Sequence, residues 1–257
     1  MFDAMAHLDD PRIRDPGAML ERAAAAGVQG LVCAGVDPSQ VPVQRWESGH
    51  TPCAVYRAFG LHPQAIDHRA VTNQLDTLAE LLAREDVVAL GEIGLDTRPH
   101  MPNVGLQEIV LRTQLQLASQ LNLPIILHCV GAVGRLLDIL SDHGPLPRGG
   151  MLHAYGGPPD LIKKFRKLGL LMSFGGKLCD PRSKKMRRAA QKVPIDSLLV
   201  ESDAPDHPVN REHGQSEPAM LPAVLDALAE LRGVSSETLA AQTMANARRL
   251  FGLQIGL

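Results

Sequence analysis

The chain has 257 residues, and its 26 Lys and Arg against 28 Asp and Glu give a formal net charge of −2. This length provides enough apolar surface for one large domain or two small ones. No stretch approaches the ~18 apolar residues of a membrane span, and the first seven residues are too polar for a signal peptide, so we expect a soluble cytoplasmic protein that does not enter membranes.

Short apolar runs recur along the chain, and each is followed by a longer segment with 3.6-residue periodicity, which is typical of parallel β/α units. The expected strands are 1–5, 28–34, 54–60, 87–93, 124–128, 150–154, 169–174 and 197–202. The expected helices between and after them are 16–26, 73–84, 106–120, 133–141, 159–168, 182–191 and 218–231. Two further helices, 235–242 and 245–251, are expected to end the chain.

Eight such units in about 250 residues is the size of a (β/α)8 TIM barrel. The sequence contains no linker, low-complexity tract or internal repeat, so we expect one domain over residues 1–257. The main competing fold is an open doubly wound sheet, which normally carries a glycine fingerprint after its first strand. The segment Met5-Ala6-His7-Leu8 contains no glycine, and this favours the barrel.

Metal-binding residue types lie in or just after the C-terminal parts of the expected strands. The set comprises Asp3, His7, His62, Glu92, His128, His153 and Asp203. The carboxyl ends of barrel strands meet on one face, so residues far apart in the sequence are expected to come together there. Imidazoles and carboxylates in one cleft suit divalent ions such as Zn²⁺, Mn²⁺, Fe²⁺ or Co²⁺.

A histidine at a strand end is more often an ordinary hydrogen-bonded residue than a ligand. His128 and His153 differ because each directly ends an apolar run that cannot bury an imidazole without a partner. Glu92 lies inside an apolar strand, where a carboxylate needs a cation. The remaining histidines are expected to have no role in the site: His50, His68, His100, His143, His207 and His213.

Several short motifs resemble the TatD family of metal-dependent hydrolases and deoxyribonucleases, and the resemblance covers essentially the whole chain. The motifs are Gly60-Leu61-His62-Pro63, Gly91-Glu92-Ile93-Gly94-Leu95-Asp96, Leu123-Pro124-Ile125-Ile126-Leu127-His128, Glu201-Ser202-Asp203-Ala204-Pro205 and Asn246-Ala247-Arg248-Arg249-Leu250-Phe251. Each motif alone is weak, but all of them in order at the family's spacing form a specific pattern.

The resemblance implies a TIM barrel of the metallo-dependent hydrolase type with one or two divalent ions, Mg²⁺, Mn²⁺ or Zn²⁺. Glu92 would bridge the two ions, His128 and His153 would hold one, and His7 with Asp203 would help to hold the other. His62 would lie near the scissile phosphate. Asp203 would help to activate water, so the implied catalytic residues are Asp203, Glu92 and His62.

The chain also departs from the family's pattern. The family opens with Asp-x-His-x-His, whereas this chain has Met5 at the first histidine position, and a thioether is a poor ligand for Mg²⁺, Mn²⁺ or Zn²⁺. Val130-Gly131 follows His128 where many members have Arg-Asp. Ala154-Tyr155-Gly156-Gly157 replaces a turn similar to Cys-Phe-Thr-Gly. Part of the phosphate-facing wall is therefore expected to differ.

Three further residues near these motifs have open roles. Asp3 is expected to orient a ligand rather than to bind metal itself. Glu201 lies two residues before Asp203 and either supports a ligand or pairs with a lysine. Alternation along the strand predicts that Cys129 faces away from the cleft and packs between barrel and helices.

A basic run places seven positive charges in the sixteen residues from Lys177 to Lys192, with only Asp180 opposing. The run follows the seventh strand, so its start is expected on the face of the barrel that holds the site. Lys177, Arg182 and Lys184 are therefore candidates to bind a nucleic-acid backbone, although a solvated helix face would have the same composition. A second basic cluster, Lys163–Lys167, is expected to lie at a helix end.

The favoured function is hydrolysis of phosphodiester bonds by a TatD-type DNase that degrades DNA from 3′ to 5′, with no obligate protein partner. The aromatic share of 3 % argues against recognition by base stacking. A metallohydrolase of a small ester, amide or phosphoester is the alternative, because a fold alone does not determine a substrate. Met5 motivates a third hypothesis, a metal-binding protein with weakened catalysis.

Overall fold

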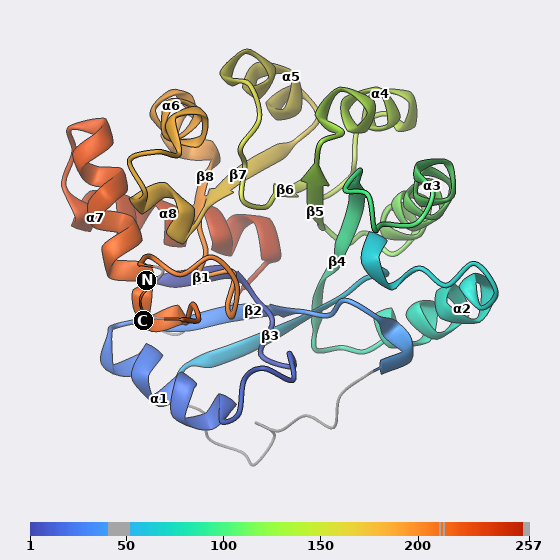
Figure 1. The fold of residues 1–257 in the computed structure, drawn as a ribbon, viewed down its shortest axis with the longest axis horizontal. Helices are drawn as coiled ribbons and strands as arrows, with labels where there is room; N and C mark the ends of the chain where they lie inside the picture. The colour runs from blue at the N-terminus through green and yellow to red at the C-terminus, as the bar shows by residue number, and fades with distance from the viewer. Residues whose placement is uncertain (41–51, 211, 213, 254–257) are drawn as a thin grey trace.

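The computed structural model describes residues 1–40, 52–210, 212 and 214–253. Eight parallel strands form one sheet in the order β1 to β8, with helices around it (Figure 1). This arrangement confirms the expected TIM barrel. Within the described ranges, no helix has both the length and the apolarity that a membrane crossing requires.

The strand positions agree with the sequence to within a few residues. The strands are β1 Phe2–Ala6, β2 Gly30–Ala34, β3 Ala54–Phe59, β4 Val87–Asp96, β5 Ile125–Val130, β6 Gly150–Leu152, β7 Leu170–Phe174 and β8 Leu198–Val200. The largest difference is in β4, which continues to Asp96 instead of ending at residue 93. This extension brings a second carboxylate to the end of the strand that carries Glu92.

The helices also follow the predicted order. They are α1 Pro16–Ala25, α2 Val71–Leu82, α3 Val104–Gln120, α4 Val133–His143, α5 Ile162–Lys167, α6 Lys184–Lys192, α7 Leu221–Arg232 and α8 Ser236–Phe251. The prediction of two separate final helices is wrong, because α8 is continuous. No glycine or proline interrupts this segment, and the Thr243 hydroxyl donates to the Leu239 carbonyl within the same helix.

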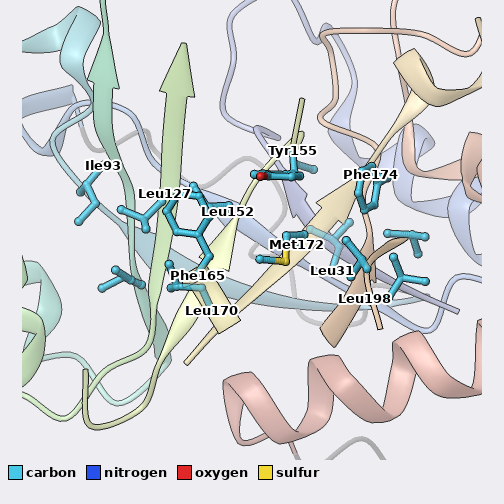
Figure 2. Close-up of a cluster of buried hydrophobic side chains, with 14 of the residues drawn as sticks. Leu31, Ile93, Leu127, Leu152, Tyr155, Phe165, Leu170, Met172, Phe174 and Leu198 are labelled. Carbon is cyan, nitrogen blue, oxygen red and sulfur yellow. The ribbon is translucent and has the colours of Figure 1, made fainter. Parts of the chain in front are cut away.

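Alternation along the strands separates two apolar layers. Val32 and Ala34 of β2 belong to a cluster inside the barrel, whereas Leu31 and Cys33 belong to the layer between strands and helices. Figure 2 shows part of this outer layer, in which Phe165 of α5 lies among side chains of the neighbouring strands. Burial on both sides explains why the strands are almost continuously apolar.

The final motif closes the end of the barrel opposite the strands' carboxyl ends. Asn246 of α8 donates from Nδ2 to the carbonyls of Ile195 and Leu198, each at 2.8 Å. The Phe251 ring lies 6.4 Å from the Phe2 ring, measured between centroids. The motif that resembles the family's C-terminus is therefore structural, and it leaves the other end of the barrel for the site.

The barrel closes between β1 and β8 through a few specific hydrogen bonds. Asp203 N donates to Met5 O at 3.1 Å, and His7 N donates to Ala204 O at 2.7 Å. Beside them, Asp3 Oδ1 accepts from Ser202 N at 2.8 Å and from Met5 N at 3.2 Å. Asp3 thus bonds to the backbone beside Asp203 and two residues before His7. Its expected role in orienting a ligand stays a prediction.

This closure yields a prediction about stability. Asp3→Ala leaves two buried N–H groups without an acceptor, so we expect the free energy of unfolding to fall by about 3 kcal/mol. Asp3→Asn keeps Oδ1 and is expected to lose much less. Unfolding in urea, followed by circular dichroism, measures both variants, and equal losses would contradict the role assigned to Oδ1.

We also expect the stability of the wild type and that of Asp3→Asn to respond differently to pH. Burial raises the pKa of Asp3 to about 7, so the folded chain keeps a proton that the unfolded chain releases at lower pH. The contribution of Asp3 to the free energy of unfolding therefore decreases as the pH rises from the usual aspartate pKa of 3.8 toward 7. We expect the wild type to lose stability relative to Asp3→Asn over that interval.

Candidate metal centre

The side chain of Glu92 lies at the centre of the site, among four imidazoles. Its Oε1 is 2.9 Å from His128 Nδ1, 3.3 Å from His153 Nε2 and 3.7 Å from His62 Nε2. Its Oε2 is 3.4 Å from His7 Nε2. These residues come from β1, β3, β4, β5 and β6 or from the residues directly after them, which is where a barrel gathers its functional groups.

Two of these imidazoles have their Nδ1 atom committed to an oxygen outside the centre. His7 Nδ1 lies 2.8 Å from the Ala34 carbonyl, and His153 Nδ1 lies 3.2 Å from Glu201 Oε1. An oxygen that only accepts requires a hydrogen on Nδ1, and Nε2 is then the nitrogen that faces Glu92. Such acceptors behind metal-binding histidines fix the ring orientation.

In His128 the two ring nitrogens exchange these positions, and one nitrogen again faces Glu92. Its Nε2 lies 3.1 Å from Asp96 Oδ2, so its Nδ1 faces Glu92. Asp96 is fully buried and also pairs with the Arg98 guanidinium. Arg98 and His128 outweigh the effect of burial and hold the pKa of Asp96 below its usual range, so its carboxylate stays available as an acceptor.

His62 differs from the other three. Its ligand atoms lie within 4.8 Å of those of Glu92 and His128, so distance alone would make it a ligand. However, the Gln64 backbone N–H donates to His62 Nδ1 at 3.1 Å. Burial lowers the pKa of His62 to about 3, so the ring is neutral and its hydrogen is on Nε2. His62 therefore presents a hydrogen-bond donor, not a lone pair, to the centre.

The electrostatics of the centre suit a cation. Burial would raise the pKa of Glu92, but His153, His62 and His128 hold it well below its usual value. Burial would lower the pKa of His153, yet the charges of Glu92, Glu201 and Asp203 raise it to about 10. Protons on imidazole thus balance the buried carboxylates. One carboxylate with three correctly oriented imidazoles is a donor set that fits Zn²⁺, Mn²⁺ or a similar divalent ion.

Asp203 lies on the edge of this centre beside β1. Its Oδ1 is 3.8 Å from His7 Nε2 and 4.0 Å from His153 Nδ1, and its Oδ2 is 3.8 Å from His207 Nε2. Burial raises the pKa of Asp203 to about 6. Burial also lowers the pKa of His207 to about 4, so this imidazole is neutral near pH 7. Asp203 can therefore exchange a proton close to neutral pH.

The centre forms the floor of a cavity of about 550 Å³. Its wall includes Arg98 and Lys177 as well as the carboxylate of Asp206, which pairs with Arg12. A cavity of this size admits a nucleotide-sized group, and its cations suit an anionic one.

The chain matches the family described as TatD related DNase over residues 2–252. It belongs to this family. A Bacillus subtilis relative, the uncharacterized metal-dependent hydrolase YabD, is 34% identical over 98% of each chain. The 3′-5′ ssDNA/RNA exonuclease TatD of Klebsiella pneumoniae is 34% identical over 99% of each chain. The crystal structure of YJJV, a TatD homolog from Escherichia coli, superposes with a TM-score of 0.89 at 34% identity, covering 99% of this chain and 98% of that one.

The TatD-family residues expected at the metal centre lie together in the structure. His7, Glu92, His128, His153 and Asp203 surround the same cavity floor, and His62 lies beside them. His207, which was expected to have no role, also lines this cavity. His50 and His213 lie outside the described residues.

Met5 does not face this cavity in the way that a ligand would. It is fully buried and packs with Phe2, Val32 and other side chains inside the barrel. Its backbone takes part in the closure, where Met5 O accepts from Asp203 N and Met5 N donates to Asp3 Oδ1. The position at which the TatD family usually has a histidine is therefore apolar here.

The two altered turns lie in the wall next to the centre. Val130 lines the central cavity, and Gly131 and Tyr155 line an adjoining one. Gly131 has a φ of 71°, and a Cβ there would collide with Thr97 Oγ1. An aspartate in place of Gly131 would therefore need a left-handed backbone and a shift of the Thr97 side chain.

The predicted substrate-binding cations lie beside the centre. Lys177 lines both cavities, whereas Arg182 and Lys184 line only the adjoining one. Burial lowers the pKa of Lys177. Cys129 differs in part from expectation: it packs against the layer between barrel and helices, but it also lines both cavities near the carboxyl end of β5.

Two supporting carboxylates could be assigned only from the structure. Asp96 was part of a recognised motif but lay beyond the expected end of its strand. Glu201 had two open roles, and the structure favours support of a ligand, because it accepts from His153, from Ala154 N at 2.8 Å and from Ser173 Oγ at 2.5 Å. The available signal was short spacing in the sequence: Asp96 lies four residues after Glu92 on β4, and Glu201 lies two residues before Asp203, just after β8.

The proton held by His153 predicts how metal affinity depends on pH. Because the pKa of His153 is raised to about 10, a metal ion must displace a proton from this ring at neutral pH. We expect the affinity to rise about tenfold for each pH unit between about pH 6.5 and pH 8. Competition with a chelator measures this dependence.

The variant His153→Ala serves as the control. It should bind the ion more weakly and with a smaller pH dependence. An affinity that does not change with pH in the wild type would contradict the protonated state of His153.

Proposed function

We propose that this protein is a divalent-metal-dependent phosphodiesterase that degrades single-stranded DNA from its 3′ end. The main supporting observation is the arrangement around Glu92, where His7, His128 and His153 each direct one ring nitrogen to the centre and hold the other against an outer oxygen. The Klebsiella relative is named a 3′-5′ ssDNA/RNA exonuclease, and this supports a nucleic-acid substrate.

Each residue of the centre has a proposed role. A divalent ion bound there acidifies water and neutralises charge on the phosphate. His62 donates its Nε2–H to a phosphoryl oxygen. Asp203 accepts the proton of the attacking water, because a pKa of about 6 leaves it ionised at neutral pH and still basic enough to accept a proton.

The same geometry supports two metal positions of unequal strength, occupied by Mg²⁺, Mn²⁺ or Zn²⁺. The tighter ion would be held by Glu92 Oε1, His128 Nδ1 and His153 Nε2. The weaker ion would be held by Glu92 Oε2, His7 Nε2 and Asp203, without the imidazole that Met5 replaces. Lys177, Arg182 and Lys184 bind the phosphates of the substrate. A cytoplasmic location and independence from a protein partner stay predictions.

A small ester, amide or phosphoester remains the second candidate substrate. The low aromatic content and the altered turns motivate it, but the cations beside the centre favour an anionic substrate. Comparing turnover of DNA with that of generic phosphodiesters and esters separates the two.

The central prediction concerns Glu92 and Asp203. With Mn²⁺ or Mg²⁺, the wild type should shorten 5′-labelled single-stranded DNA from its 3′ end, and EDTA should stop the reaction. Glu92→Gln and Asp203→Asn should each lower kcat/KM at least ~100-fold, because each removes a group required at the reacting phosphate.

The control for this experiment is Glu230→Gln, an exposed carboxylate on α7. It should leave the rate unchanged. Full activity in both Glu92→Gln and Asp203→Asn would refute the proposed function.

A second prediction concerns Met5. Met5→His restores the missing imidazole, so the number of tightly bound ions per chain should rise from one toward two. The volume-matched Met5→Leu should bind the same number of ions as the wild type, because Met5 contributes only apolar packing. Equilibrium dialysis with metal analysis measures both, and identical stoichiometry in all three proteins would argue against a weakened second position.

A further inference from the structure

A cavity of about 590 Å³ adjoins the metal centre. The two cavities share five lining residues, which are Cys129, Val130, His153, Ala154 and Lys177. A flexible chain that reacts at the centre can therefore continue directly into this second space.

The charge of this adjoining cavity is entirely positive among the residues that the structure describes. Lys177, Arg182, Lys184 and Lys185 line it, and no carboxylate does. Arg182 is paired with Asp180. The three lysines have no ion-pair partner in the described part of the chain, so their charge is available to a ligand.

The N-terminus of α6 adds to the same potential. Ser183, Lys184 and Lys185 from its first turn line the cavity, and Ser183 makes no side-chain cap. The first N–H groups of a helix have no partner within the helix, and its dipole is positive at this end. The lysine side chains and the helix therefore attract the same kind of ligand, an anion.

The cavity offers little for recognition of a base. Its one aromatic lining residue in the described ranges is Tyr155, which is 3% exposed and donates its hydroxyl to the Pro158 carbonyl. Stacking needs an exposed aromatic face. The cavity therefore suits binding of phosphate groups and not recognition of the base sequence.

A third cavity, of about 740 Å³, adjoins the centre through His7, Asp10, Val36 and Gln64. Asp9, Asp10, Asp37 and Asp67 line it, and none of its described lining residues is Lys or Arg. A polyanion that leaves the centre in this direction would be repelled. The two neighbouring cavities therefore differ in sign, and this difference gives a bound strand one favoured direction.

We infer that the cavity lined by Lys177, Lys184 and Lys185 is a second phosphate subsite, which binds the phosphodiester on the 5′ side of the scissile one. This inference rests on the proposed function. It adds that the enzyme binds two consecutive phosphates of its substrate. A single strand is bound with its continuing 5′ part over α6. Substrates with only one phosphate use the metal centre alone.

Three thymidine dinucleotides test the subsite. One has only the internal phosphodiester, one has an added 5′-phosphate, and one has an added 3′-phosphate. The last two are isomers of equal charge, so they separate a subsite from general attraction. We expect the 5′-phosphate to raise kcat/KM about tenfold, in line with a phosphate held by charged donors. The 3′-phosphate should give no gain.

The double variant Lys184→Ala, Lys185→Ala should bring the ratio of kcat/KM for the 5′-phosphorylated and unphosphorylated dinucleotides close to one. Alanine maintains the helix, so α6 should persist. The matched control is Lys163→Ala, Lys164→Ala, which removes two exposed charges from α5 and should keep the full ratio.

The outcomes separate the inference from the function on which it rests. Three results would overturn the subsite while hydrolysis is intact. They are a ratio near one in the wild type, a preference for the 3′-phosphate, and an unchanged ratio in the α6 variant. Failure to cleave any of the dinucleotides or longer single-stranded DNA contradicts the proposed function and overturns the subsite with it.

Discussion

The buried carboxylate of Glu92 is the constraint from which the rest of the site follows. A charge that is 3% exposed inside an apolar strand is costly unless positive groups surround it. The imidazoles supply that compensation, and each in turn needs a partner for its outer nitrogen. The Ala34 carbonyl, Asp96 and Glu201 provide these partners, so the centre consists of a carboxylate, a ring of imidazoles and an outer ring of acceptors.

All four rings are histidine, so their different chemical roles come from the hydrogen-bond partners around each ring. His62 and His128 both lie near Glu92 Oε1, yet one receives a hydrogen bond from Gln64 N and the other donates to Asp96. The same side chain is therefore a donor at one position and a ligand at the other. A similar division applies outside the centre, where cations and carboxylates line separate neighbouring cavities.

Sequence patterns were sufficient for the barrel and for most of the centre. Strand alternation and the rule that functional groups follow barrel strands located His7, Glu92, His128 and His153. These patterns could not predict which ring nitrogen of each histidine faces the centre. That orientation depends on backbone groups such as Ala34 O, which every residue has. Asp96 was overlooked because the end of a strand is poorly determined by composition, and His207 because a solvent-facing loop has no periodicity. The continuous α8 shows that a change of polarity without glycine or proline does not end a helix.

The hydrogen bonds that close the barrel also determine when the site is complete during synthesis. Glu92, His128 and His153 have all been translated well before the chain reaches β8, but Asp203 and Glu201 have not. Only when Asp203 N meets Met5 O do the first and last strands join and the last carboxylates reach the imidazoles. A chain synthesised only as far as β7 therefore holds most of the candidate metal ligands without the residue placed to accept a proton. Assembly of the centre thus depends on the joining of the first and last strands.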